Sequence, residues 1–317
     1  MTTAVIVVLV LLVAFMLFGV PVGFAIGGAT MAAMWFCSDL NMVVNAQYCY
    51  SGIFSFTVMA IPFFMLAGVI MSTGGIARRI VDFASALIGF VTGSLGCVTI
   101  LACMFFGALC GSGMATASAI GSMMIPEMKK KGYDVPYATT VVCFAAIVGP
   151  IIPPSLSFVL YGAATKTSVP DLFRAGILPG VLIGVLFILM NIFLCKRHGW
   201  DLRQKSIQAQ ADAEKVLTKE EQKALMRRAM KERLHMIWKT FKDGFWALLS
   251  PVIILGGIYG GVFTATEAGA VGCLYGVIVG VCIYRTVKTR DLFDIFATAA
   301  YQMGSLQIIF PFTMIFT

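Results

Sequence analysis

Charge is scarce in this sequence. Lysine, arginine, aspartate and glutamate make up 12% of the 317 residues, about half of the roughly 25% that soluble domains carry. Apolar residues make up 59%, and several uncharged runs reach the ~20 residues that a helix needs to cross a bilayer. The runs are too long for the short alternating segments of a β-barrel. The sequence therefore predicts an all-α, polytopic membrane protein and excludes a soluble globular one.

Motifs for catalysis, metal binding and nucleotide binding are also missing. The nine cysteines are scattered and form no CxxC or Cys/His cluster, so we interpret them as small core residues. No GK[ST] follows a glycine-rich stretch, which excludes a phosphate-binding loop. Both histidines, His198 and His235, lie in a charged segment and are expected in solvent. We expect no enzyme activity, no use of ATP by this chain and no nucleic-acid partner.

The basic clusters predict a topology. Arg78 and Arg79 follow one apolar run, and Lys129–Lys131 end another. Because short basic loops stay in the cytoplasm, segment 93–126 between the clusters must cross the membrane an even number of times. Its 34 residues are too few for two full spans of ~20 residues and a turn. We predict a re-entrant hairpin whose tip is GALCGSGMAT.

Prolines interrupt the expected span 136–161 in the motif GPIIPPS. They are Pro150, Pro153 and Pro154. Since proline has no N–H to donate, the carbonyls of Ala146, Gly149 and Pro150 should lack helical partners. Free carbonyls at the negative end of the half-helix 137–148 favour a cation such as Na⁺. The alternative is a proline kink that neighbouring helices relieve.

The hairpin tip carries small and hydroxylated residues. Ser112, Thr116 and Ser118 supply hydroxyls, and the glycines admit a close backbone approach. N–H groups at the start of the second half-helix favour an anionic substrate nearby. The alternative is a GxxxG-type packing face formed by Gly107 and Gly111.

Two charged features need separate interpretation. Glu267 is the only charged residue in 245–284. An acid in a membrane is a functional candidate, but the motif TATE more closely fits a helix cap formed by Thr264 and Glu267.

Segment 196–244 carries 13 Lys/Arg against 7 Asp/Glu. Together with its apolar residues, this composition predicts a helix on the cytoplasmic membrane surface. A solvated helical linker is the alternative. Its apolar residues, with the flanking tryptophan, are Leu225, Met226, Leu234, Ile237, Trp238 and Trp246.

The predicted spans suggest an inverted repeat. In this interpretation 1–72 holds three spans, with a break at GVPVG and a polar loop over 39–51, and 245–317 holds three spans of opposite orientation. The expected regions are scaffold 1–72, a transport domain 73–161 with an amphipathic arm over 80–91, a loop (162–174) and closing helix within 162–195, the basic segment 196–244, and an incomplete second scaffold 245–317. By repeat symmetry, about 120 further residues would complete the second half.

Five ordered segments resemble the large membrane subunit of tripartite ATP-independent periplasmic (TRAP) transporters. They are AIPFFMLAGVIMSTGGIARRIVDFASALIG, FGALCGSGMATASAIGSMMIPEMKKKGY, GPIIPPS, LFRAGILPG and GVFTATEAGAV. The resemblance implies an elevator-type importer of organic acids, coupled to Na⁺, in the bacterial inner membrane. It also implies as partners a small membrane subunit, a periplasmic substrate-binding protein, an organic-acid substrate such as a C4-dicarboxylate or sialic acid, and membrane lipid.

The resemblance also implies a site between GSGMAT and GPIIPPS. Its Na⁺-binding candidates are Ser112, Gly149, Pro150 and Pro153, and its substrate-binding candidates are Gly111, Gly113, Thr116 and Ser155. Cys110 departs from the family pattern, where a serine is expected. Two other functions remain open. One is a dicarboxylate or ion transporter that works without a binding protein, and the other is a structural membrane scaffold.

Overall fold

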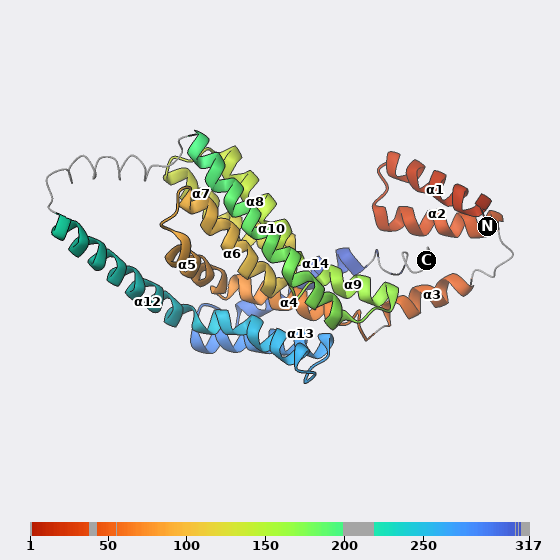
Figure 1. Cartoon of the computed structure of the whole chain (residues 1–317). Coiled ribbons are helices and arrows are strands. Elements are labelled where there is room, and N and C mark those ends of the chain that lie inside the picture. The colour runs from red at the N-terminus through yellow and green to blue at the C-terminus, as the bar shows by residue number, and fades with distance from the viewer. Residues whose placement is uncertain are drawn as a thin grey trace.

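The computed structural model describes residues 2–37, 43–54, 56–198, 219–307, 309 and 311, and these residues form helices joined by turns (Figure 1). The helices are α1 (Thr2–Leu17), α2 (Val22–Cys37), α3 (Val43–Ile53), α4 (Ala60–Thr73), α5 (Ile76–Ile88), α6 (Ser94–Cys110), α7 (Gly113–Lys130), α8 (Val135–Val148), the 3₁₀ turn η1 (Gly149–Ile151), α9 (Leu156–Thr165), α10 (Val169–His198), α12 (Lys219–Tyr259), α13 (Ala265–Val277), the π-helical η2 (Ile278–Ile283) and α14 (Asp291–Gln307).

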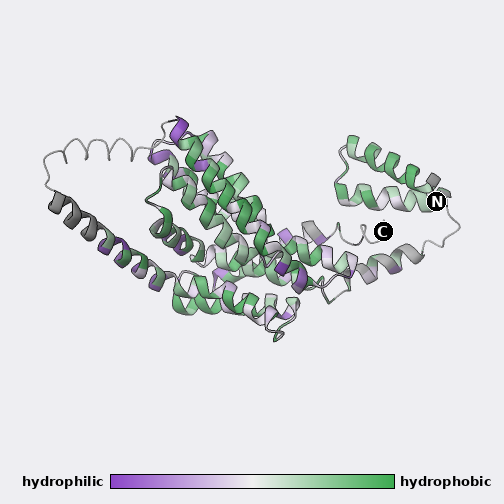
Figure 2. Cartoon of the chain, in the orientation of Figure 1, coloured by the Kyte–Doolittle hydropathy of each residue, from purple (hydrophilic) through white to green (hydrophobic). Residues whose placement is uncertain are grey.

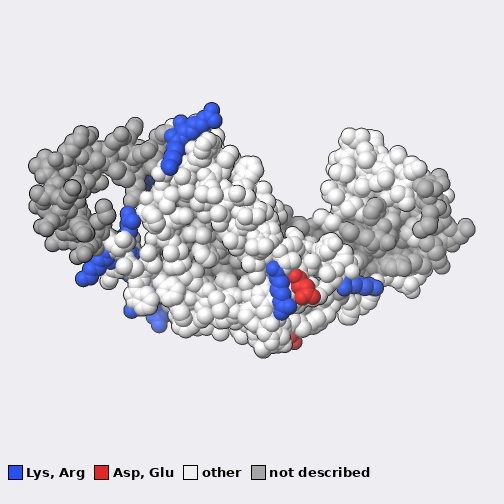
Figure 3. Space-filling view, in the orientation of Figure 1, with Lys and Arg blue, Asp and Glu red and all other residues white. Residues whose placement is uncertain are grey.

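Several of these helices are long and apolar enough to cross a membrane. Three qualify alone, over 169–198, 230–259 and 265–283, and the number rises to five if each of two bent pairs forms one span. The bent pairs are α4 with α5 (69°) and α8–η1 with α9 (43°). Hydrophobic residues predominate along the central helices (Figure 2), and the face in Figure 3 is largely uncharged over these helices. The predicted all-helical membrane protein is confirmed.

The break predicted at GVPVG is confirmed. Gly19 has a left-handed φ of 77°, and α1 and α2 pack antiparallel as a hairpin that stands apart from the central helices (Figure 1). Pro21 accepts the first helical hydrogen bond of α2, from the N–H of Ala25. The outer faces of the hairpin are apolar and exposed, as lipid-facing helices require.

Two predicted loops are wrong. The helix α3 covers 43–53, where a polar loop was expected over 39–51, because no glycine or proline interrupts that stretch; the span expected from residue 52 begins only at Ala60. Helices also cover most of the expected loop 162–174, because α9 continues to Thr165 and α10 begins at Val169. Pro170 fits the first turn of a helix, where its missing N–H is not needed. Residues 38–42 and 55 lie outside the described residues.

Segment 93–126 forms a helical hairpin, as predicted, although its second helix continues to Lys130. The two open ends lie together, since the Thr99 hydroxyl near the start of α6 contacts the Met128 sulfur near the end of α7 at 3.8 Å. The buried Asn191 of α10 donates from its side-chain amide to the Gly93 carbonyl at 3.1 Å and accepts from the Tyr137 hydroxyl of α8. The starts of α6 and α8 and the end of α10 therefore meet at one level.

The arm and the basic segment pack together. The predicted amphipathic arm is α5, which buries Ile76, Ala77, Ile80 and Ala84. The 41-residue helix α12 packs against it and runs without interruption across position 244/245, where the basic segment was expected to end. In α12, Leu234, Trp238 and Trp246 are exposed; the placement on a membrane surface stays a prediction. Residues 199–218 and the side chains of Leu225 and Met226 lie outside the described part.

Glu267 caps α13, as predicted. The Thr264 N–H donates to the Glu267 carboxylate at 2.8 Å, and the Glu267 N–H donates to the Thr264 hydroxyl at 3.3 Å, which completes a capping box. The exposed histidines His198 and His235 agree with their expected solvent positions. The carboxylate of Glu267 therefore serves the helix end, which accounts for an acid within an apolar stretch.

The hairpin topology can be tested by cysteine labelling. Arg78 and Lys130 line one polar crevice of about 540 Å³ between α5 and α7. We expect Arg78→Cys and Lys130→Cys to react with a membrane-impermeant maleimide from the same, cytoplasmic side. Ala164→Cys, exposed near the end of α9, should react only from the opposite side. The background should lack the exposed Cys143 and Cys282. Labelling of Arg78→Cys and Lys130→Cys from opposite sides would show that segment 93–126 crosses the membrane an odd number of times, and would contradict the re-entrant hairpin.

Candidate functional site

Four helix ends meet where the hairpin tip contacts the broken span. The C-terminal ends of α6 and α8 and the N-terminal ends of α7 and α9 converge there. The N–H of Leu156, the first residue of α9, donates to the Gly111 carbonyl at the tip at 3.4 Å. Helix C-termini carry partial negative charge and N-termini partial positive charge. The junction therefore offers carbonyl oxygens for a cation beside N–H groups for an anion.

The turn of the hairpin requires glycine. Gly111 has a φ of 62°, in the left-handed region that favours glycine. A Cβ at this position would lie 2.8 Å from the Pro154 carbonyl oxygen and 3.1 Å from the Leu156 nitrogen. The tip can therefore turn and touch the break only if this residue has no side chain.

The backbones of α6 and η1 are in direct contact. A Cβ on Gly107 would lie 2.1 Å from the Gly149 Cα, and a Cβ on Gly149 would lie 2.8 Å from the Gly107 Cα. No other residue type fits either position without moving a helix. The alternative interpretation of Gly107 and Gly111 as a packing face is thus confirmed, and this packing is what holds the tip at the break.

The two inner hydroxyls of the tip have defined partners. Ser112 is the N-cap of α7, and its half-buried hydroxyl accepts from the Ala115 N–H at 3.4 Å. Thr116 is fully buried, donates to the Ser112 carbonyl at 2.8 Å and lies 3.2 Å from the Cys110 sulfur. Ser118, the third hydroxyl expected at the tip, is exposed on α7. Only Ser112 and Thr116 of the three belong to the junction.

One of the predicted free carbonyls has a partner. The Gly149 carbonyl accepts from the Ile152 N–H at 3.2 Å, so the expectation that it lacks a helical partner is wrong. The reason is that η1 is a 3₁₀ turn, whose i→i+3 bond bypasses the missing N–H of Pro153. Pro150 cannot donate to the Ala146 carbonyl in the α-helical pattern. That carbonyl faces Gly113, where a Cβ would lie 3.2 Å from its oxygen.

Three glycines pack closely against oxygens at the junction. Gly113 faces the Ala146 carbonyl, and Gly111 faces the Pro154 carbonyl. Gly149 faces Thr116, whose hydroxyl oxygen would lie 3.3 Å from a Cβ built on Gly149. Uncharged oxygen donors suit a hard cation. Within the described residues, no group of three or more His, Cys, Asp or Glu side chains could hold a metal ion. The Ala146 carbonyl was predicted to lack a helical partner because Pro150 stands at i+4, whereas the Pro154 oxygen was not among the predicted oxygens.

The remaining predicted residues divide into two places. Ser155 is fully buried as the N-cap of α9, where its hydroxyl accepts from the Phe158 N–H at 3.3 Å. The Pro150 ring lies 3.3 Å from a Cβ position on Gly113. Both belong to the junction. Pro153 lines an apolar cavity between α6, α10 and α12. All of the predicted site residues except Pro153 are therefore brought together.

A glycine stripe on α10 supports the break from another side. A Cβ on Gly176 would lie 2.7 Å from the Ile151 carbonyl oxygen, and a Cβ on Gly180 would lie 2.6 Å from the Ile152 side chain. A Cβ on Gly184 would lie 2.3 Å from the Met104 sulfur. This stripe was not predicted from the sequence. The i, i+4, i+8 spacing in GILPGVLIG is a small-xxx-small signal that could have indicated it.

The chain is similar to a known family of membrane proteins and to several of its members. Residues 9–316 match the model of the family described as "Tripartite ATP-independent periplasmic transporter, DctM component". An isethionate TRAP transporter permease protein DctMQ of Oleidesulfovibrio alaskensis is 35% identical over 302 residues, which cover 95% of this chain and 44% of that protein.

Two further relatives come from Vibrio cholerae. The sialic acid TRAP transporter large permease protein SiaM is 35% identical over 87% of this chain and 59% of its own length. The C4-dicarboxylate TRAP transporter large permease protein DctM is 38% identical over 89% of this chain and 57% of its own length. The chain spans about half the length of the curated relatives it matches.

Close packing at the junction predicts a specific loss of stability. Gly107→Ala should force α6 and η1 apart and destabilise the protein by about 1–3 kcal/mol or more, because the opposing atoms belong to backbone. Gly256→Ala on α12 is the matched control, since nothing lies within 4 Å of its Cβ position. That control should be neutral or stabilising by up to ~1 kcal/mol. Thermal unfolding in detergent measures both, and equal midpoints would contradict the close contact.

Proposed function

Because the chain belongs to the DctM family, the large permease component of tripartite ATP-independent periplasmic transporters, we propose that it takes part in Na⁺-coupled import of an organic acid. Family membership makes it part of a multi-pass membrane transporter and not an enzyme. Its substrate, its coupling ion and its partners belong to the proposal.

The observation that carries the proposal is the meeting of four helix ends at the junction. Carbonyl oxygens of Ala146 and Pro154, with the hydroxyls of Ser112 and Thr116, lie on the side where a cation would bind. The N-terminal ends of α7 and α9 lie beside them, and their N–H groups suit a carboxylate. Ser112 and Ser155 cap these ends, and Gly111 and Gly113 allow the backbones of the tip and the break to approach closely.

Coupling follows from the nearness of the two ligands. A Na⁺ ion at the carbonyl side would place positive charge beside the anion at the N–H side, so each would increase the affinity for the other. In an elevator mechanism the junction, carried by α6 to α9, moves as one body against α4, α13 and the long α12. The close glycine contacts between α6, η1 and α10 suit such a body, because tightly packed elements move together.

The substrate class follows from the relatives. Their names include isethionate, sialic acid, C4-dicarboxylate and 2,3-diketo-L-gulonate as transported compounds. All are organic anions at neutral pH, and we propose a carboxylate for this chain. As in a tripartite system, a periplasmic binding protein would deliver it and a small membrane subunit would complete the inner-membrane assembly.

Uptake into proteoliposomes tests the function. The complete permease, reconstituted with its small membrane subunit, should accumulate a radiolabelled carboxylate only when the cognate binding protein and an inward Na⁺ gradient are both present. Replacing the Na⁺ gradient by a K⁺ gradient of equal size should abolish uptake. Uptake without the binding protein would favour the binding-protein-independent transporter. Absence of uptake under all conditions, with intact assembly, would favour a structural scaffold.

The cation site can be tested at Ser112. Ser112→Ala should remove one neutral oxygen ligand and raise the Na⁺ concentration for half-maximal uptake by roughly 5- to 150-fold, which corresponds to about 1–3 kcal/mol. The same change also removes the N-cap of α7. Thr264→Ala, which removes the N-cap of α13 in an exposed capping box, is the control and should leave the Na⁺ dependence unchanged. Equal Na⁺ dependence in wild type and Ser112→Ala would refute this ligand.

A further inference from the structure

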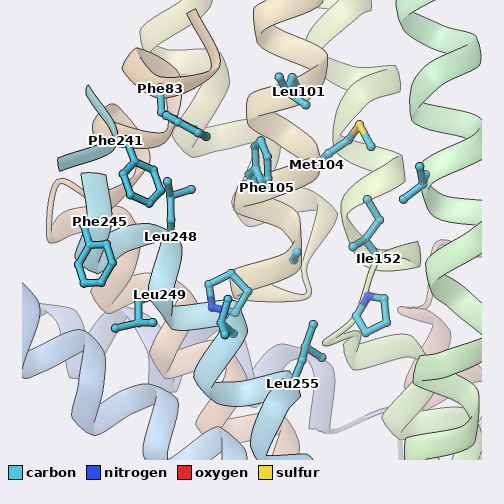
Figure 4. A pocket seen from close by; sticks show the side chains of 15 residues that line it. Phe83, Leu101, Met104, Phe105, Ile152, Phe241, Phe245, Leu248, Leu249 and Leu255 are labelled. Carbon is cyan, nitrogen blue, oxygen red and sulfur yellow. The ribbon is translucent and has the colours of Figure 1, made fainter. Parts of the chain in front are cut away.

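An apolar cavity of about 650 Å³ lies between α12 and the elements that form the junction. Every one of the 15 residues that line it is apolar. In Figure 4, Phe241, Phe245 and Leu248 of α12 stand on one side, with Phe83 of α5 above them, and Met104 of α6 and Ile152 face them across the open space. The volume falls within the roughly 300–1,000 Å³ of pockets that hold a ligand.

Water is a poor occupant of this cavity. A water molecule in an apolar site needs two to four polar partners, and the lining offers none from its side chains. An empty space of this size is also unfavourable, since the lining loses dispersion contacts on the open side. The same argument excludes the proposed organic-acid substrate, whose charge would be unpaired there. The lining therefore suits a hydrocarbon chain.

The position of the cavity places it at membrane depth. Ile152 and Pro153, at the break in the middle of the α8–α9 pair, form part of its wall. Along α12 it extends from Phe241 to Leu255, within the apolar stretch 230–259 that is long enough to span a bilayer. Lipid hydrocarbon surrounds such a stretch, so acyl chains are the occupants available at this depth.

Basic side chains stand at one end of the cavity. Lys242 is exposed and lies three residues before Phe245, about one helical turn away. Its ammonium group sits 5.5 Å from the Trp238 ring, and exposed tryptophans of this kind mark the membrane–water boundary. Lys239 and Arg233 are also exposed on α12, against the exposed acids Glu232 and Asp243. The net charge at this end is positive and complements a phosphate headgroup.

We propose that one anionic phospholipid of the bilayer binds here, with an acyl chain in the cavity between α12 and the α6–η1 wall and its phosphate at Lys239 and Lys242. The lipid fills the boundary between α12 and the elements that hold the junction. Binding of the lipid does not depend on which substrate is transported or on whether Na⁺ is the coupling ion. Its occupancy should affect how easily the two walls slide past each other.

Photo-cross-linking identifies the occupant. The complete permease with a benzophenone amino acid in place of Leu248, which lines the cavity, is reconstituted in nanodiscs of phosphatidylglycerol and phosphatidylcholine and irradiated. Mass spectrometry of the cross-linked peptide should show a phospholipid adduct. A peptide adduct, from another part of the protein or from a partner subunit, would overturn the proposal. So would the absence of any lipid adduct while the same amino acid at the exposed Leu186 of α10 forms one.

Retention of lipid tests the two halves of the site. Val252→Trp, at a lining residue whose side chain is 63% exposed, should fill the cavity and reduce the lipid retained in native mass spectrometry by about tenfold. Lys239→Gln with Lys242→Gln should retain a lipid but lose the preference for the anionic headgroup, at about fivefold per lysine. Lys288→Gln with Arg290→Gln carries the same charge change elsewhere and should keep that preference. Unchanged retention and preference in all three would refute the site.

Discussion

The structure depends on the contact between two glycines, Gly107 and Gly149, at which the backbones of α6 and η1 meet without side chains between them. In a membrane, backbone polar groups that leave the helical pattern must find partners within the protein. Here the hairpin tip and the break supply one another, since the Leu156 N–H donates to the Gly111 carbonyl. Two interrupted helices are therefore tolerated because they are interrupted at the same place.

This arrangement links packing and function in the same residues. Gly107 and Gly111 form a packing face, which would be a complete structural explanation of both. The same close approach leaves the oxygens of Ala146, Pro154 and Thr116 without a side chain over them. These oxygens, at converging helix ends, are the feature from which a cation site is proposed for this chain. The packing explanation and the binding explanation are thus two consequences of one geometry.

The surroundings of the junction differ sharply in character. On the α10 side, Gly176 and Gly180 admit direct contact with the break, and Gly184 admits direct contact with Met104 of α6. On the α12 side, large aromatic and aliphatic residues stand back and leave a cavity. Tight backbone packing joins elements into one body, whereas an unfilled apolar boundary permits movement. The elevator mechanism proposed for the chain needs both kinds of boundary.

The sequence by itself determined where helices break, because glycine and proline act through local geometry. Glycine permits the left-handed φ that Gly111 adopts, and Pro150 has no N–H whatever its surroundings. Thr264 and Glu267 likewise form their capping box within four residues. The sequence did not determine the loop lengths. A proline such as Pro170 can stand in the first turn of a helix or follow the end of one, and the local sequence does not distinguish the two.

Only the tertiary structure decided which oxygens face which glycines. That the Gly149 carbonyl is satisfied by Ile152 while those of Ala146 and Pro154 face the tip depends on a 3₁₀ turn and on the docking of a distant hairpin. Such contacts join residues about 40 positions apart, and no local pattern encodes them.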